Sequence, residues 1–431
     1  MKGPGRSGRR LLRAAVAWAF CSAIVRSRRP DRALRKILPG LTVSVTVVPI
    51  AAISLWISEF PLHALAAEAT FAASMIARGA LRQLSGRTAI AVAGAAWLGL
   101  ITSHRDTVRT HAVLDDALRA ELGADYWEGL PARHYVETPA SLRKKWFPRF
   151  TERKNYLRHE NLSYGEAGVR NHLDIWYRAD LPANGRAPVI LQIPGSAWVK
   201  GGKRGQAYPL LAHMAERGWV CVAINYSLAP KARWPAHIID TKRAIVWVKR
   251  EIACYGGDPD FIILTGGSAG GHLTALAALS PSAPTFQPGF EDADTSVVGA
   301  VPFYGVYDLL DRNGDSPPEQ EAFLRRIVIG ASAQDAYDVW DQGSALSWVN
   351  ADAPPFFVLH GDIDTFTNPE QARAFVDSLK AVSRNPVVYA QLPGAQHMFD
   401  ALPTIRTAAV VAAVDRFLTY LHHRRSTTAS P

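Results

Sequence analysis

The chain has 431 residues, of which 48% are hydrophobic, so it is long and apolar enough to form a large folded core. Its net charge of +10 comes from the N-terminus, where the first 40 residues carry 11 of the 48 Lys and Arg residues but one of the 38 Asp and Glu residues. Because the rest of the chain balances the two signs, its basicity is no argument for binding nucleic acid, and we expect no nucleic-acid partner. Three scattered cysteines, Cys21, Cys221 and Cys254, are too few for a disulfide framework or a zinc site.

Three apolar segments follow the basic N-terminus. Leu41–Ser58 has no charged residue and is about as long as a helix that crosses a bilayer. Phe60–Ala77 is similarly apolar apart from one histidine and one glutamate, and Thr88–Ser103 is apolar but short. We therefore predict two or three transmembrane helices within residues 41–103. Leu11–Val25 lies between basic clusters, which favours an amphipathic helix on the membrane surface.

Basic residues also predict the topology of these helices. The basic tail, residues 1–40, is expected in the cytoplasm, and Arg78, Arg82 and Arg87 would keep the second loop on the same side. Three spans place the rest of the chain outside the cytoplasm, whereas two leave it inside. We expect a protein of the cell membrane with an extracytoplasmic catalytic domain; the alternative is that the apolar segments are core helices of a soluble domain.

Residues 104–160 are predicted to form a connecting, cap-like helical segment. An amphipathic helix is indicated by the spacing of its apolar residues, which are Val108, Leu114, Leu118 and Leu122. The aromatic stretch that follows suits either packing over the next domain or lying on a membrane surface, and it contains Trp127, Trp146, Phe147 and Phe150.

Residues 161–425 alternate short apolar runs with helical patterns, which predicts a mostly parallel sheet with helices on both faces. The fold class is therefore α/β, preceded by an all-helical membrane-associated region. The expected strands are Leu173–Arg178, Val189–Ile193, Trp219–Asn225, Phe261–Leu264, Val297–Phe303, Phe356–Leu359 and Pro386–Leu392. The expected helices include Gln206–Arg217, Pro235–Tyr255, Pro369–Val382 and Thr404–His422.

The segment Gly266-Gly267-Ser268-Ala269-Gly270 lies between an apolar strand and a helical run, which is the G-x-S-x-G pattern of a nucleophile elbow. Glycines two residues either side of the serine avoid collisions with the neighbouring strand and helix. By itself the pattern also fits a phosphate-binding turn or an ordinary loop, so the assignment depends on a base and an acid elsewhere.

Those partners follow later strands. Asp364 comes after Phe356–Leu359 and His397 after the last strand, so the chain order is Ser, Asp, His, as in α/β-hydrolases. Asp362 and Asp308 compete with Asp364 for the role of the acid. All of these residues follow strand C-terminal ends, where sites in open α/β sheets assemble.

An oxyanion site is the next requirement. Pro194-Gly195-Ser196-Ala197-Trp198 follows the strand Val189–Ile193. The backbone N–H groups of Ser196 and Ala197, with that of Ala269, are the candidate donors to the oxyanion.

From about Asn161 the chain resembles the hormone-sensitive-lipase-like branch of the α/β-hydrolases, and with its N-terminus it resembles mycobacterial Lip-type membrane esterases. The oxyanion segment departs from that family's H-G-G-G-W, since only Gly195 and Trp198 are kept, and this puts the usual ester preference in doubt. The resemblance implies no metal and no dissociable cofactor. The matching segments are Gly266–Gly271, His360-Gly361-x-x-Asp364, Gly394-x-x-His397-x-Phe399, Asn225–Pro230 (with Ser227 in place of Arg) and Tyr255–Asp260.

These features predict a membrane-anchored serine carboxylesterase or lipase that hydrolyses small-molecule or lipid-like esters. Ser268 is the expected nucleophile, His397 the base and Asp364 the residue that orients it. Two alternatives remain open: a deacylase or amidase acting on cell-envelope material, and a catalytically idle hydrolase domain acting as a membrane scaffold.

Overall fold

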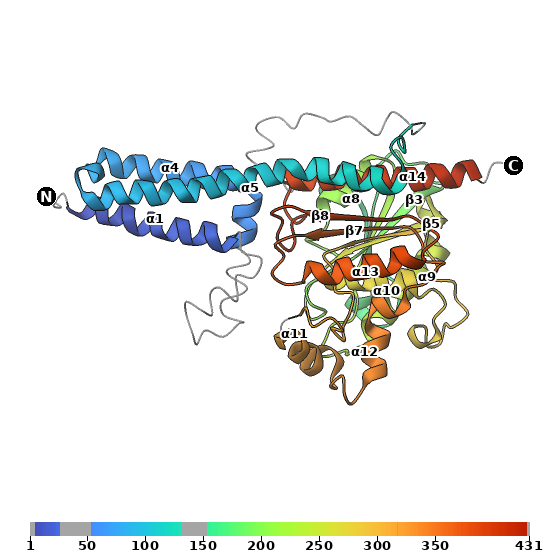
Figure 1. Cartoon of the computed structure of the whole chain (residues 1–431). Helices are drawn as coiled ribbons and strands as arrows, with labels where there is room; N and C mark the ends of the chain where they lie inside the picture. Colours follow the sequence, from blue (N-terminus) through green and yellow to red (C-terminus); the bar gives the residue numbers. More distant parts are fainter. Residues whose placement is uncertain (1–4, 26–52, 129, 131–152, 317, 429–431) are drawn as a thin grey trace.

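The computed structural model describes residues 5–25, 53–128, 130, 153–316 and 318–428. An N-terminal set of helices projects from one end of an α/β domain, and the two chain termini lie at opposite ends of the molecule (Figure 1).

A sheet of eight strands forms the centre of the α/β domain. Its strand order is β1-β2-β4-β3-β5-β6-β7-β8. β2 pairs antiparallel with β1 and with β4, and all the other pairs are parallel. The strands are β1 (Leu157–Ser163), β2 (His172–Trp176), β3 (Ala187–Ile193), β4 (Val220–Ile224), β5 (Gly257–Gly267), β6 (Gly299–Phe303), β7 (Phe356–Gly361) and β8 (Val387–Leu392).

Helices cover both faces of the sheet, and an apolar core lies under each layer. One layer contains α8 (Tyr208–Glu216), α14 (Ile405–Thr428) and the second half of α5 (Leu84–Leu122). The opposite layer contains α9 (Ala236–Glu251), α10 (Ala269–Leu279) and α13 (Pro369–Val382). Shorter helices and helical turns are α7 (Arg153–Tyr156), η3 (Gly168–Asn171), η4 (Ile252–Tyr255), η5 (Pro284–Phe286), α11 (Pro318–Phe323), η6 (Leu324–Ile329), α12 (Tyr337–Gly343) and η7 (Ala345–Trp348).

The predicted α/β fold with a mostly parallel, double-covered sheet is confirmed. Each of the seven expected strands overlaps an observed strand, and Pro369–Val382 is a helix over the predicted residues. β1 was not expected, and it crosses the predicted boundary at residue 160 between the connecting segment and the α/β domain. Its sequence, LRHENLS, is polar and mostly accessible to solvent, so it lacks the apolar signal of the buried strands.

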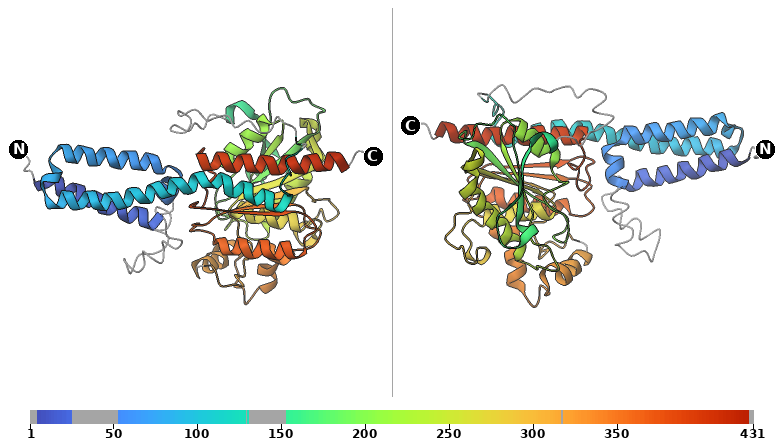
Figure 2. Two further views of the ribbon diagram at one scale, coloured as in Figure 1. Left: turned by 45° about the horizontal axis from the view of Figure 1, so that its top comes forward. Right: turned by 180° about the vertical axis from the view of Figure 1, so that it is seen from behind.

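The helical unit, which we define as α1 (Gly5–Val25), α4 (Pro61–Ala77), η1 (Ala80–Arg82) and the first half of α5, forms one bundle (Figure 2). Small residues allow close packing of its helices, as is common in membranes. The buried contact residues are Leu11, Ala15, Ala72, Met75, Ala80, Ala89 and Ala93.

α5 connects the helical unit to the α/β domain without a break. It contains both the apolar segment Thr88–Ser103 and the predicted amphipathic helix that follows, and it continues along α14 (Figures 1 and 2). In its second half Leu114 and Leu118 are buried against the α/β domain, whereas Val108 is exposed.

By length and composition, α5 is the one helix within the described ranges that is suited to cross a membrane. The helices Ile53–Glu59 and α4 pass the same test only as a pair, and they meet at a bend of 98°. The remaining part of the predicted span Leu41–Ser58, residues 41–52, lies outside the described residues, as do Trp146, Phe147 and Phe150.

The α14 layer provides a test of core packing. Phe357 on β7 is fully buried and its ring lies 5.4 Å from that of Phe417 on α14. Phe357→Ala is expected to lower the free energy of unfolding by about 3–5 kcal/mol, because it leaves a cavity between sheet and helix. Denaturant unfolding in detergent measures this. Val382→Ala, at an exposed position, is the control and is expected to change stability by less than about 0.5 kcal/mol; equal losses would contradict the assignment of the core.

Candidate active site

Ser268 lies in the sharp turn between β5 and α10, with φ 58° and ψ −122°. This backbone conformation is strained for a residue with a side chain and is typical of functional turns. A Cβ atom added at Gly266 would lie 2.5 Å from the backbone oxygen of Ile193, and one at Gly270 would lie 2.1 Å from it. Both glycines are therefore required by the close approach of β3, as the nucleophile-elbow pattern predicts.

The loop that follows β3 packs directly against this turn. A Cβ atom at Gly195 would lie 2.4 Å from the backbone oxygen of Gly267 and 3.2 Å from Cβ of Ser268. The next two residues, Ser196 and Ala197, have φ values of 84° and 55°. They adopt a left-handed conformation that glycine would take without strain.

Two side chains hold this loop in place. The N–H of Gly195 donates to Oε1 of Gln206 at 2.7 Å. The hydroxyl of Tyr226 donates to the backbone oxygen of Pro194 at 2.9 Å, and this tyrosine is almost completely buried. Ala269 directly follows Ser268 and is the first residue of α10. Because the first N–H groups of a helix have no acceptor within the helix, the N–H of Ala269 is left without one there.

His272 links the same loop to α10. Nε1–H of Trp198 donates to Nδ1 of His272 at 3.2 Å, and Nε2 of His272 lies 2.7 Å from the backbone oxygen of Gly343. Since the indole can only donate, His272 carries its proton on Nε2 and is neutral. Burial lowers the pKa of His272 to about 4, and the bond to Gly343 only partly opposes this. These contacts pack His272 between α10 and the loop after β3, behind the turn of Ser268.

Asp364 and His397 are hydrogen-bonded, with 2.7 Å between Oδ2 and Nδ1. Asp364 also accepts hydrogen bonds from the N–H groups of Phe366 and Thr367, at 2.8 and 2.9 Å, and from the Thr367 hydroxyl at 3.0 Å. These bonds fix the carboxylate in the turn after β7, where it is nearly inaccessible to solvent.

The electrostatics of this pair keep the carboxylate charged. Burial by itself raises the pKa of Asp364, but the charge of His397 and the hydrogen bonds from His360 and His397 outweigh it. The pKa of Asp364 is therefore held well below its usual range. Nε2 of the buried His360 lies 3.4 Å from Oδ2 of Asp364 and 3.0 Å from the backbone oxygen of Thr367, so this histidine supports the turn.

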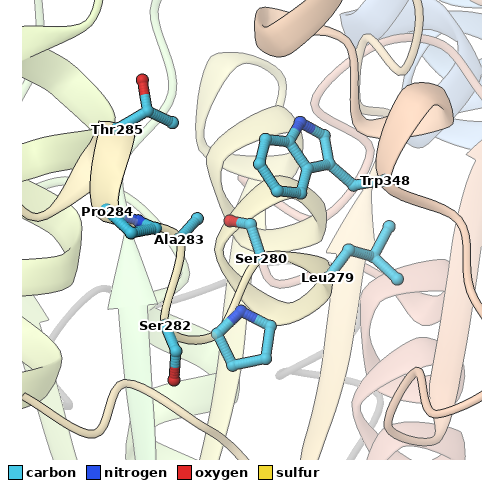
Figure 3. Close-up of a pocket in the computed structure, with 8 residues that line it drawn as sticks. Leu279, Ser280, Ser282, Ala283, Pro284, Thr285 and Trp348 are labelled. Carbon is cyan, nitrogen blue, oxygen red and sulfur yellow. The ribbon is translucent and has the colours of Figure 1, made fainter. Parts of the chain in front are cut away.

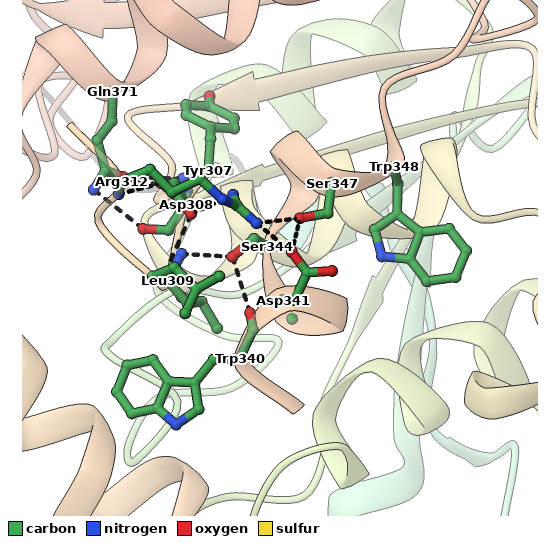
Figure 4. A network of polar contacts seen from close by, with 12 residues as sticks. Tyr307, Asp308, Leu309, Arg312, Trp340, Asp341, Ser344, Ser347, Trp348 and Gln371 are labelled. Carbon is green, nitrogen blue, oxygen red and sulfur yellow. Dashed lines mark hydrogen bonds and ion pairs between the residues drawn. The ribbon is translucent and has the colours of Figure 1, made fainter. Parts of the chain in front are cut away.

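The two competing carboxylates have other partners. Asp362 accepts the N–H of Gly394 at 2.7 Å and so supports the loop that carries His397. Asp308 forms an ion pair with Arg312 at 2.7 Å, in a network that includes Asp341 (Figure 4). Of the three candidate acids, Asp364 is the one bonded to His397.

Tyr304, which directly follows β6, contacts both halves of the site. A Cβ atom at Gly267 would lie 2.6 Å from its hydroxyl, and its ring centroid lies 4.6 Å from that of His397. The Tyr304 hydroxyl donates to Asp400, and burial raises the pKa of both groups. Sequence reasoning missed this residue; its position immediately after a strand next to β5 was the available signal.

A shallow pocket of about 370 Å³ lies at the C-terminal end of α10, where Leu279 and the loop after it form part of its lining (Figure 3). It is lined by the loop Leu279–Thr285 and by Trp348. Because α10 separates it from the elbow by 11 residues, or about 16 Å, it is no part of this site. Within the described ranges no group of three or more His, Cys, Asp or Glu side chains is arranged to hold a metal ion.

The buried His272 predicts a pH-dependent loss of stability. Between about pH 6.5 and pH 4 the unfolded chain binds a proton at this residue and the folded chain does not, so acidification favours unfolding. The expected loss from this residue is about 3 kcal/mol across the window. His272→Gln is expected to reduce the pH dependence of unfolding, measured by denaturant titration between pH 4 and pH 7; an unchanged dependence would contradict the buried neutral state.

Comparisons with known proteins identify the family of the chain. A family model described as BD-FAE matches residues 173–379. The probable carboxylic ester hydrolase LipM of Mycobacterium tuberculosis is 45% identical over 393 residues, which cover 88% of each chain. Esterase LipQ of the same organism is 43% identical over 358 residues, which cover 83% of each chain.

A solved structure of a truncated carbohydrate esterase from gut microbiota has a TM-score of 0.53 at 22% identity and covers 61% of this chain and 98% of its own. This likeness shows that the chain has the α/β-hydrolase fold. The predicted resemblance to Lip-type esterases is confirmed by the relatives that match almost the whole chain. The chain belongs to the family of carboxylic ester hydrolases that includes LipM and LipQ.

Proposed function

We propose that this protein is a membrane-anchored serine esterase in which Ser268, His397 and Asp364 form the catalytic triad. The observation that carries the proposal is the 2.7 Å bond between the buried Asp364 carboxylate and Nδ1 of His397, at the same sheet edge as the strained turn of Ser268. Membership of an esterase family supports the same reaction.

We propose a role for each group of the triad. Asp364 accepts the Nδ1–H of His397, which leaves Nε2 as the basic nitrogen. Nε2 takes the proton of the Ser268 hydroxyl as its oxygen attacks the ester carbonyl. His397 then donates that proton to the leaving alcohol, and water, activated by the same nitrogen, hydrolyses the acyl-enzyme.

The negative charge on the tetrahedral intermediate requires donors beside Ser268. The N–H of Ala269 at the start of α10 and those of Ser196 and Ala197 in the facing loop are the groups we assign to this role. Side chains replace glycines in the left-handed turn at Ser196 and Ala197, so the loop is narrower and stiffer than one built of glycine. We expect this to restrict which acyl groups fit.

Apolar side chains next to His397 support an acyl substrate. The Phe366 ring lies 5.2 Å from that of His397, and Phe366 and Met398 are each 40% exposed although large and apolar. Such exposed apolar residues suit contact with the hydrocarbon part of an ester. Lipid-like acyl esters are therefore the substrate class that we propose.

Membrane association is supported by the surface of the helical unit. Large apolar side chains that face outward include Leu84 and Leu98 on α5, exposed by 81% and 66%, and Trp56 on the adjoining helix Ile53–Glu59, exposed by 59%. Exposed apolar surface of this kind marks contact with a membrane or a partner, and we propose that α5 crosses the bilayer. The basic N-terminal tail favours a cytoplasmic N-terminus and an extracytoplasmic hydrolase domain.

The triad is tested by substitution. Ser268→Ala is expected to lower kcat for p-nitrophenyl esters by a factor of at least about 10³, and Asp364→Asn by about 10²–10⁴, because the first removes the nucleophile and the second the group that orients the base. Asp308→Asn is the matched control and is expected to retain activity, since its partner is Arg312.

Labelling by a fluorophosphonate extends this test, because it requires an activated serine. The wild-type protein is expected to react and Ser268→Ala is not. Activity that survives Ser268→Ala would overturn the assignment of the nucleophile. A wild-type protein that resists the probe and hydrolyses no ester would instead favour an idle scaffold, and cleavage of amides but not esters would favour an amidase.

The membrane anchor is tested on α5 itself. Leu98→Lys is expected to weaken membrane retention by about 3 kcal/mol, because it places a charge in the apolar stretch. Val108→Lys, also exposed but beyond that stretch, is the control and is expected to have no effect. Carbonate extraction measures retention, and protease added to intact cells reports the side of the hydrolase domain. Equal behaviour of both variants would contradict a span through Leu98.

A further inference from the structure

We propose that Arg406 is a positioning residue that ties the loop carrying His397 to α5 and to the helix Ile53–Glu59, so that hydrolysis depends on these two helices being in place. The inference rests on the proposed role of His397 as the base. Arg406 is the second residue of α14 and is completely buried, 0% exposed, where α14, α5 and the Pro393–Gly394 turn meet.

The guanidinium of Arg406 contacts both parts of the molecule at once. Toward the α/β domain, its Nη1 donates to the backbone oxygen of Pro393 at 2.7 Å and its Nη2 to that of Gly394 at 3.2 Å. Toward α5, it donates to Thr110 Oγ1 at 3.0 Å and Thr107 Oγ1 at 3.2 Å, and toward the helix Ile53–Glu59 it donates to Glu59 Oε1 at 2.8 Å. Its five N–H donors are the reason that one side chain can serve so many acceptors.

The contacted turn precedes His397 by three residues and is held from two sides. Arg406 binds the backbone oxygen of Gly394, while Asp362 accepts the N–H of the same residue at 2.7 Å. A Cβ atom at Gly394 would lie 3.1 Å from Cβ of Asp106, so the turn also packs directly on α5. The position of His397 relative to the Asp364 turn therefore depends on Arg406.

On the other side, Arg406 neutralises a glutamate in an apolar segment. Glu59 is buried at the 98° bend between the helix Ile53–Glu59 and α4, and its Oε2 accepts the Thr404 hydroxyl at 2.8 Å. A buried carboxylate without a partner is strongly unfavourable, so the bend and Arg406 stabilise each other. This gives a reason for a charged residue between two predicted apolar spans.

A second ion pair of α14 provides a matched control. Arg416, ten residues further along α14, forms an ion pair with Asp115 of α5 at 2.6 Å. This pair links α14 to α5, which Arg406 also contacts through Thr107 and Thr110, but it lies away from the Pro393–Gly394 turn. A role specific to the His397 loop should therefore distinguish Arg406 from Arg416.

The test uses the full-length protein in detergent. The double variant Glu59→Gln with Arg406→Met removes both charges of the buried pair and leaves neither unpaired, and Asp115→Asn with Arg416→Met does the same for the control pair. We expect the first to lower kcat for p-nitrophenyl butyrate by about tenfold or more while KM changes by less than about twofold, because the base is misplaced and substrate contacts are kept. The control is expected to keep kcat within about twofold.

Two further measurements separate positioning from loss of folding. Arg406→Lys keeps a charge opposite Glu59 but has one nitrogen in place of three, so an intermediate kcat is expected, and this variant carries the test if the double variant does not fold. The rate of fluorophosphonate labelling is expected to fall in parallel with kcat at an unchanged thermal midpoint.

Wild-type kcat in the Glu59 and Arg406 variants, or equal losses of kcat and thermal midpoint in both double variants, would overturn the positioning role. Neither result would affect the proposed nucleophile if Ser268→Ala is inactive. Conversely, activity in Ser268→Ala would overturn the proposed function itself.

Discussion

Parallel pairing of adjacent strands is the constraint on which the site depends. β3, β5, β6, β7 and β8 run in the same direction, so their carboxyl ends meet at one edge of the sheet. The loop that we propose to bind the oxyanion, Ser268, the Asp364 turn and the His397 loop each follow one of these ends. Residues that are distant in the sequence therefore become neighbours, and the apolar core that fixes the strand register also fixes the distances within the site.

Much of this arrangement could be predicted because its signals are local. Ser268, Asp364 and His397 each belong to a short strand-to-loop pattern, and the apolar runs of the inner strands are clear. β1 lacked such a signal because its residues are polar and it forms the edge of the sheet. The division near residue 104 reflected a change from apolar to polar composition, whereas backbone hydrogen bonds continue α5 through that point.

Other contributors could not be found from local patterns, because their contacts are distant in sequence. Tyr304 packs against both Gly267 and His397, because it lies beside the turn of Ser268. Arg406 donates a hydrogen bond to Glu59, which lies 347 positions earlier in the sequence. Gln206 and Tyr226, which lie in two separate loops, form hydrogen bonds with the loop after β3. In each case the side chain type is ordinary, and only the fold shows what it contacts.

Because α5 is continuous, it fixes the distance between its apolar stretch and the proposed active site. Its apolar stretch ends at Ser103, and Asp106, beside the turn that leads to His397, lies three residues further, or about 5 Å along the helix axis. If that stretch lies in the bilayer, the reacting edge of the sheet sits at the level of the lipid headgroups. An ester already dissolved in the membrane would then reach the serine by diffusing within the bilayer and moving a short distance out of it, with no need to cross bulk water. Access of such an ester to the serine would then not depend on its solubility in water.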